Sequence, residues 1–233
     1  MESYTILYED EDVLVANKVA PIPVQPEKTG DKSLQEYLRQ ELSAREGGRE
    51  GHFLEAAHRI DRRASGAVVF AKTHIALSTL EAAFRDKRIE KEYLACVERE
   101  PVPAKGKLEH RLAWDKRRNI VRTLSAASIS GKPATLEYEL VGRSEHYFFI
   151  SVNLVTGRHH QIRAQLSAIG CPIRGDLKYG ARRSSPSGLV MLHARRLAFA
   201  QPRTSSRIEI LAPFPESEPL WQAFQGSQDA GTA

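Results

Sequence analysis

The stretch "AAHRIDRRASGAVVFAKT" (residues 56–73) sets a single carboxylate, Asp61, among basic side chains and directly before an apolar run. The basic neighbours are His58, Arg59, Arg62 and Arg63. The segment "GAVVFAK" has the length and β-branched content of a buried strand, so we expect Asp61 to stand on a loop at a strand end. Most acids in such surroundings form surface salt bridges. Whether Asp61 does more depends on the rest of the chain.

Around this stretch the sequence predicts strands and helices that do not alternate regularly. "YTILYED", "EDVLVANK" and "EKEYLACVE" have strand patterns, and residues 107–155 contain four more that short polar turns join. Ser33 and Glu36 form a capping box before the helix "SLQEYLRQEL", and Thr73 can cap the helix "HIALSTLEAAFRD". The pattern argues against a doubly wound nucleotide-binding fold. We expect an α+β fold with a mixed, mostly antiparallel β-sheet and flanking helices.

The length of 233 residues allows one large domain or two small ones, and we expect a single domain over residues 1–223. The polar, glycine-rich segment 43–52 is interpreted as a flexible surface insertion, because no shift in composition follows it. Residues 224–233 are expected to form a flexible tail.

The composition indicates a globular protein with a modest excess of positive charge. The formal net charge is +5 and the pI is near 9.2. No apolar run is long enough to span a bilayer, and the N-terminus is not a signal peptide, so we expect a cytoplasmic protein with reduced cysteines. Basic clusters lie at residues 86–88, 115–118, 181–183 and 194–196. They could line one groove for a phosphate backbone, or they could be four separate solvated faces.

A second informative stretch is "VTGRHHQIRAQLSAIGCPIRGDLKYG" (residues 155–180). It predicts a helix that opens at Thr156 or Gly157 and closes at Gly170. On such a helix Arg163 lies at the margin of the apolar face, where an unpaired charge would cost several kcal/mol. Asp61 is the partner we expect. The pair could serve catalysis, or it could be a structural brace without chemistry.

Several motifs in register resemble the RluA-type pseudouridine synthases. "HRIDRRASGAVVFAK" is similar to that family's His-Arg-Leu-Asp signature, and "TGRHHQIRAQLSAIGCPIRGDLKYG" is similar to its Thr-Gly-Arg…His-Gln-Ile-Arg segment. "EKEYLA", "MLHARRLAF", "ILAPFP" and "ILYEDEDVLVANK" resemble further family strands in the same order. The resemblance implies the pseudouridine synthase fold. In that fold a central catalytic cleft divides the sheet into two halves. It also implies an isomerase that converts uridine to pseudouridine in a loop of structured RNA, either rRNA or tRNA.

The resemblance assigns roles to individual residues. Asp61 would be the essential carboxylate, by a glycal or an acylal route, and Arg163 would hold it. Tyr93 would stack on the extruded base, whereas Arg59 would fill the gap that base flipping leaves and Ile162 would form part of the pocket wall. The remaining candidates for RNA binding are Arg158, His160, Arg182 and Arg183. No metal or other cofactor is expected for an isomerisation, and a monomer is expected.

The chain also departs from the family pattern. Val19 and Pro21 stand where the family more often has proline and glycine, and Arg63 and Ala64 replace a more usual Asp-Thr. We expect these changes to affect the choice of RNA rather than the chemistry. We expect the chain to begin directly with the catalytic module, without the small S4-type domain of many relatives. Two other classes stay open: a catalytically silent RNA-binding protein on this fold, and a metal-dependent nuclease that uses Asp61 and histidines.

Overall fold

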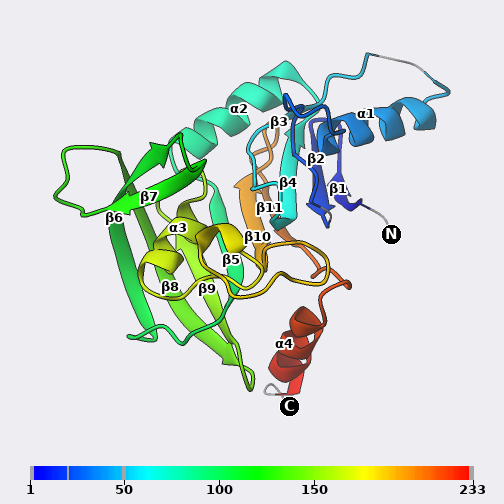
Figure 1. Cartoon of the computed structure of the whole chain (residues 1–233). Helices are drawn as coiled ribbons and strands as arrows, with labels where there is room; N and C mark the ends of the chain where they lie inside the picture. The colour runs from blue at the N-terminus through cyan, green and yellow to red at the C-terminus, as the bar shows by residue number, and fades with distance from the viewer. Residues whose placement is uncertain (1–2, 20, 49–50, 231–233) are drawn as a thin grey trace. The chain divides into compact units, whose positions relative to one another are not determined.

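The computed structural model describes residues 3–19, 21–48 and 51–230. It divides the chain into two compact units, which are treated separately below. The first unit contains residues 1–91 and 194–214, and the second contains residues 92–193 and 215–233. The division falls within strand β5 (Glu90–Val97) and within strand β10 (Leu192–Ala200) (Figure 1). The prediction of a single domain over residues 1–223 therefore stays a prediction.

The first unit is a small sheet with two helices. Its strand order is β1-β2-β4-β10, in which β1 is Tyr4–Glu9, β2 is Val13–Lys18 and β4 is Ser65–Ala71. The short strand β3 (Glu55–Ala56) pairs with β4, and β11 (Arg207–Leu211) pairs with β10. The pairs β1–β2, β2–β4, β3–β4 and β10–β11 are antiparallel. The strands predicted on either side of the acidic turn, and the strand after Asp61, are confirmed.

Two capped helices cover this sheet. Helix α1 (Leu34–Arg45) begins with the predicted capping box of Ser33 and Glu36. Helix α2 (His74–Arg85) is capped by Thr73, as predicted, and its Leu80 is buried on strands β2 and β4 (Figure 1). Helix α1 extends into the segment predicted as a flexible insertion, so that prediction is wrong for residues 43–45. Residues 49–50 of the segment lie outside the described residues.

Gly66, at the start of β4, allows β10 to approach β4 closely. Its φ of +116° lies in the region that favours glycine. A Cβ atom at this position would stand 2.4 Å from the carbonyl oxygen of Ala194 on β10. The close approach of β10 to β4 therefore requires glycine, five residues after Asp61.

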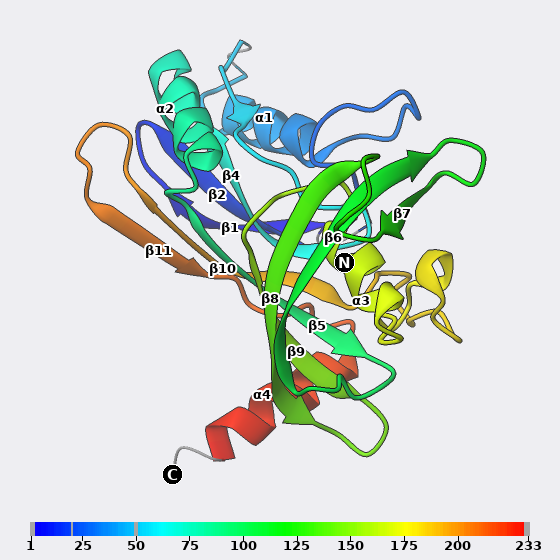
Figure 2. The ribbon, with the colours of Figure 1, turned by 90° about the vertical axis from the view of Figure 1, so that its left-hand side faces the viewer.

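The second unit contains an antiparallel sheet. Its strand order is β5-β9-β8-β6-β7, in which β9 is Phe148–Leu154, β8 is Lys132–Arg143, β6 is Lys105–Asp115 and β7 is Ile120–Leu124. All four pairings are antiparallel, which confirms the predicted run of strands. Helix α3 (Gln161–Ala168) packs beside β6 and β7, where Ala164 is buried with Leu112 and Val121 (Figure 2). The α+β class with a mostly antiparallel sheet is confirmed.

The C-terminal segment is helical. Helix α4 (Pro219–Ala230) includes most of the segment that was expected to be a tail from residue 224. Phe224 is 6% exposed and stacks on Phe149 with ring centroids 4.5 Å apart. A short 3-10 helix, η1 (Leu177–Tyr179), follows α3. Among the described residues, every helix is too short or too polar to cross a bilayer.

Candidate active site

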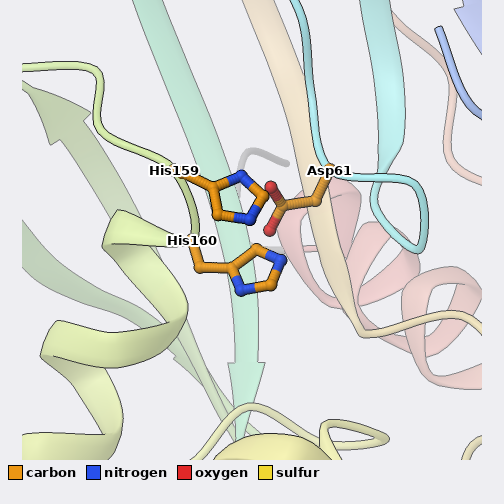
Figure 3. A group of neighbouring side chains, drawn as sticks. All are labelled: Asp61, His159 and His160. Atoms are coloured by element: carbon orange, nitrogen blue, oxygen red, sulfur yellow. The ribbon is translucent and has the colours of Figure 1, made fainter. Parts of the chain in front are cut away.

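Asp61 lies half-buried on the loop that joins β3 to β4 in the first unit (Figure 3). Two backbone–backbone hydrogen bonds and one from a backbone N–H to a side chain hold this loop. The Ala64 N–H donates to the Asp61 carbonyl at 2.9 Å and closes a turn, and the Ala57 N–H donates to the Val69 carbonyl at 3.1 Å. The Val69 N–H in turn donates to Nε2 of His58 at 3.2 Å. The carboxylate is thus fixed on a loop whose two ends are anchored to β4.

His58 must be neutral to hold the loop in this way, because a protonated Nε2 could not accept the Val69 N–H. Burial, with a smaller effect of the positive charge of Lys91, lowers the pKa of His58 to about 3. The ring also lies against Phe84, with centroids 4.7 Å apart. The apparent cation at His58 is therefore a structural imidazole.

Lys18 is a cation that the sequence analysis did not single out. It ends strand β2, is fully buried, and donates from Nζ to the Arg62 carbonyl at 2.8 Å. Burial lowers the pKa of Lys18 to about 7, an effect that the negative charge of Asp61 opposes and the positive charge of Arg62 strengthens. The sequence did contain a signal for this residue, because Lys18 ends the largely apolar strand "VLVANK". A lysine in a buried strand indicates a cation with nearby polar partners.

The arginines around Asp61 have different tasks. Arg62 binds the Asp31 carboxylate at 2.8 Å and donates from Nε to the Pro21 carbonyl at 3.0 Å, so it holds the neighbouring loop. The side chains of Arg59 and Arg63 are exposed, and neither forms an ion pair with any residue that the structure describes. Only these two of the cations around Asp61 are presented to solvent without a carboxylate partner in the described chain.

In the second unit, helix α3 starts later than predicted. Its first residue is Gln161, and the preceding His160 has a left-handed backbone with φ 52°. The Gln161 carboxamide oxygen accepts from the Thr156 hydroxyl at 2.8 Å and from the Arg158 N–H at 2.9 Å, which folds these residues into a turn. A helix opening at Thr156 or Gly157 is therefore wrong, and His159 is not on the helix face of Arg163.

Arg163 is buried more deeply than the predicted core margin, at 5% exposure. It forms a two-pronged ion pair with Asp176: Nε to Oδ2 is 2.6 Å and Nη2 to Oδ1 is 2.8 Å. Its guanidinium also lies 4.9 Å from the ring centroid of Tyr179. Asp176, in the quoted segment "GDLKYG", was not considered as a partner. The pairing with Asp61, which belongs to the other unit, stays a prediction.

A row of rings surrounds the start of α3. Nδ1 of His160 lies 2.8 Å from the Tyr179 hydroxyl, which accepts the Val121 N–H at 2.8 Å. Burial lowers the pKa of His160 to about 2, with smaller contributions from Arg163 and other nearby cations. The rings of His159 and His160 stack at 3.9 Å (Figure 3). His160 is therefore a neutral support beside Arg163.

The other predicted residues of the second unit are either buried or on its surface. Tyr93 on β5 is 7% exposed and pairs with Val152, and Ile162 on α3 is 5% exposed. The exposed residues are Arg158, whose Nε donates to the Pro133 carbonyl, and Arg182 and Arg183. Because Asp61 and Arg59 belong to the first unit, the convergence of all these residues into one site stays a prediction.

Comparisons with known proteins identify the family. Residues 12–168 match the family model described as RNA pseudouridylate synthase. The ribosomal large subunit pseudouridine synthase C of Vibrio vulnificus (strain CMCP6) is 34% identical over 230 residues, which cover 96% of this chain and 70% of that protein. The uncharacterized RNA pseudouridine synthase YlyB of Bacillus subtilis (strain 168) is 32% identical over 216 residues, which cover 91% of this chain and 69% of that protein.

Two solved human structures share the fold. RNA Pseudouridylate Synthase Domain Containing 1 has a TM-score of 0.74 at 24% identity and covers 92% of this chain and 84% of its own. RNA Pseudouridylate Synthase Domain Containing 4 has a TM-score of 0.73 at 21% identity and covers 91% of this chain and 88% of its own. With the motifs at Asp61 and Arg163 in register, the chain belongs to the RNA pseudouridylate synthase family, in its RluA-type branch, and is an isomerase of uridine in RNA.

Proposed function

We propose that this protein converts a uridine of ribosomal RNA into pseudouridine, with Asp61 as the essential carboxylate. The names of the relatives support the choice of ribosomal RNA, since several are ribosomal large subunit pseudouridine synthases. The reaction cleaves the N-glycosidic bond, turns the uracil within the site and rejoins it to C1′ through carbon. No atom is gained or lost, so no metal or other cofactor is part of the proposal.

The observation that carries the proposal is the setting of Asp61. This half-buried carboxylate lies on a loop that hydrogen bonds connect to β4. Lys18 also holds the loop, because its Nζ donates to the Arg62 carbonyl. Such anchoring keeps a reacting group within the small tolerance that catalysis needs. Either a glycal or an acylal route uses the ionised form of this carboxylate.

Arg163 is proposed to hold Asp61 in the working enzyme. A guanidinium carries five N–H donors, and Asp176 receives two of them. Asp176 also balances the charge of Arg163, and this compensates for the cost of burying the guanidinium in the absence of RNA. Arg163 is thus oriented within its own unit.

The target nucleotide is proposed to be flipped out of the RNA, with Tyr93 stacking on the base and Ile162 forming part of the apolar wall. Arg59 would occupy the vacated stack. Its side chain is exposed and free of any carboxylate in the described chain, which supports this role. Unstacking costs a few kcal/mol in a helix and less in a loop, so a loop uridine is the expected target.

The four basic clusters differ in how far acids neutralise them. Arg196 binds Glu90 and Glu209, and Arg88 binds Asp86, so residues 194–196 and 86–88 are largely balanced. By contrast, the side chains at 116–118 and at 182–183 form no ion pair with a described residue. Phosphate contacts are therefore assigned to the second unit, at these two clusters, with Arg158 and His160 nearer to α3.

The test compares RNA from cells with and without the gene. Pseudouridine-specific labelling, which adds mass only to the isomerised base, should reveal one or a few ribosomal positions that lose the label. Loss confined to tRNA would keep the chemistry and overturn the choice of RNA. Unchanged modification in all RNAs would overturn the proposal. The same cell extract gives the native mass and location, for which a cytoplasmic monomer is proposed.

A further inference from the structure

The β6–β7 hairpin of the second unit presents an exposed tryptophan beside α3. Trp114 on β6 is 46% exposed and pairs with Val121 on β7. Ala113, Trp114, Asp115, Lys116, Arg122 and Leu124 line an open hollow of about 410 Å³. A tryptophan at this position offers a flat ring that a ligand entering the hollow can contact.

The ring of Trp114 continues the row of rings described at α3. Its centroid lies 5.3 Å from that of His159, which stacks on His160, which in turn contacts Tyr179. Nζ of Lys178 lies 6.0 Å from the Trp114 ring centroid. These aromatic side chains lead along one unit from the hairpin to the residue that packs on Arg163.

Cations lie on the same hairpin as this ring, and two of them, Lys116 and Arg122, line the hollow with it. Lys116, Arg117 and Arg118 lie on the hairpin turn and Arg122 lies on β7, and none forms an ion pair with a residue in the described parts of the chain. The one acid of the turn, Asp115, accepts the Arg118 backbone N–H at 3.1 Å. An exposed aromatic ring and cations that line one hollow form an arrangement that suits single-stranded RNA, because bases stack on the ring and phosphates bind the cations.

We infer that Trp114 is a stacking platform for an unpaired nucleotide of the substrate, separate from the target uridine, with Lys116 and Arg122 binding its phosphates. The inference rests on RNA being the substrate of the proposed function. It assigns to the hairpin a share of substrate choice, because only an RNA with an unpaired nucleotide at the right distance from the target could use both sites.

Fluorescence offers a direct test, because the chain has two tryptophans and the other, Trp221, is 1% exposed. The probe is a short single-stranded oligocytidylate, which contains no uridine and cannot be a substrate. Binding should quench the emission of Trp114, and Trp114→Phe should remove that change. Trp114→Ala should weaken binding by about five- to a hundredfold, and Trp114→Phe should restore most of the affinity.

Salt dependence separates stacking from phosphate contact. Arg122→Ala should make the slope of log K against log salt shallower by about 0.7, whereas Trp114→Ala should leave the slope unchanged. Ile129→Ala is the matched control, since Ile129 is 99% exposed in the same unit and outside the hollow. An abasic ribose-phosphate oligomer should bind the wild type and Trp114→Ala equally.

Equal binding of the oligocytidylate by Trp114→Ala and the wild type, or equal quenching by the abasic oligomer, would overturn the inference. Thermal unfolding of each variant guards against misfolding, and a Trp114→Ala protein that melts early is replaced by Trp114→Leu. Because the probe is never converted, these outcomes do not depend on pseudouridine formation. A failure of the proposed function would appear only in the labelling experiment.

Discussion

Replacing Asp176 by asparagine removes the negative charge that faces the Arg163 guanidinium. Both residues are buried, at 5% exposure for Arg163 and 1% for Asp176, and two hydrogen bonds join their side chains. Removing one partner of such a buried pair typically costs about 3–5 kcal/mol. We expect Asp176→Asn to lower the free energy of unfolding by about that much, a large part of the ~5–15 kcal/mol available.

Urea unfolding followed by tryptophan fluorescence is the suitable assay, because Trp114 and Trp221 both lie in the second unit with Asp176. Glu139→Gln is the matched control. It removes one partner of an exposed pair, Lys105–Glu139 at 2.8 Å, and should cost less than about 1 kcal/mol. If Asp176→Asn were as stable as this control, the reasoning about the buried pair would be refuted.

The double variant Arg163→Met with Asp176→Leu separates stability from catalysis. Apolar replacement of both partners removes the desolvation cost as well as the attraction, so it should recover much of the stability that Asp176→Asn loses. It should not recover activity, because the residue proposed to hold Asp61 is gone. An active double variant would contradict the catalytic role of Arg163 while leaving the account of its burial intact.

Three further predictions concern the first unit and the reaction. Gly66→Ala should strongly reduce the yield of folded protein, measured by thermal unfolding, because the new Cβ would stand 2.4 Å from the Ala194 carbonyl oxygen in a backbone that favours glycine; a wild-type melting temperature would contradict the close approach. Burial lowers the pKa of His58 to about 3 in the folded protein, so the free energy of unfolding should fall as the pH falls. Above about pH 6.5 the imidazole is neutral in both the folded and the unfolded protein. Between pH 6.5 and pH 3 only the unfolded protein binds the proton, which lowers the free energy of unfolding by up to about 1.4 kcal/mol per pH unit. His58→Gln should flatten that dependence between pH 6.5 and 5 in urea titrations, and an unchanged slope would exclude His58 as its source. Treatment with EDTA should leave pseudouridine formation unchanged, and a loss that added metal reverses would favour the metal-dependent alternative.

Much of the fold could be predicted because local signals agreed with the tertiary structure. The capping box at Ser33 and the cap at Thr73 are decided within four residues of chain, and both were correct. The predicted start of α3 was wrong because the interactions that set it cannot be recognised from the sequence pattern. The buried Gln161 side chain satisfies the turn before it, and His160 adopts a left-handed backbone that residue preferences alone would not favour.

The site was predicted in part for a similar reason. Asp61 and Arg163 were found through isolated charge and motif spacing, whereas Lys18 and Asp176 were missed as partners. Their importance comes from burial: Lys18 is fully buried, and Asp176, the residue before η1, is buried against Arg163. Burial of a charge depends on packing between distant segments, which a one-dimensional pattern does not contain. The free and neutralised basic clusters could not be told apart for the same reason.

The central claim is that Asp61 carries the chemistry, and single-turnover conversion of the target RNA by Asp61→Asn measures it most directly. The variant should bind RNA with the wild-type salt dependence and form no pseudouridine above background. Asp31→Asn, which alters another carboxylate of the first unit that pairs with Arg62, is the control and should convert its substrate. Substantial conversion by a folded Asp61→Asn protein would contradict the account.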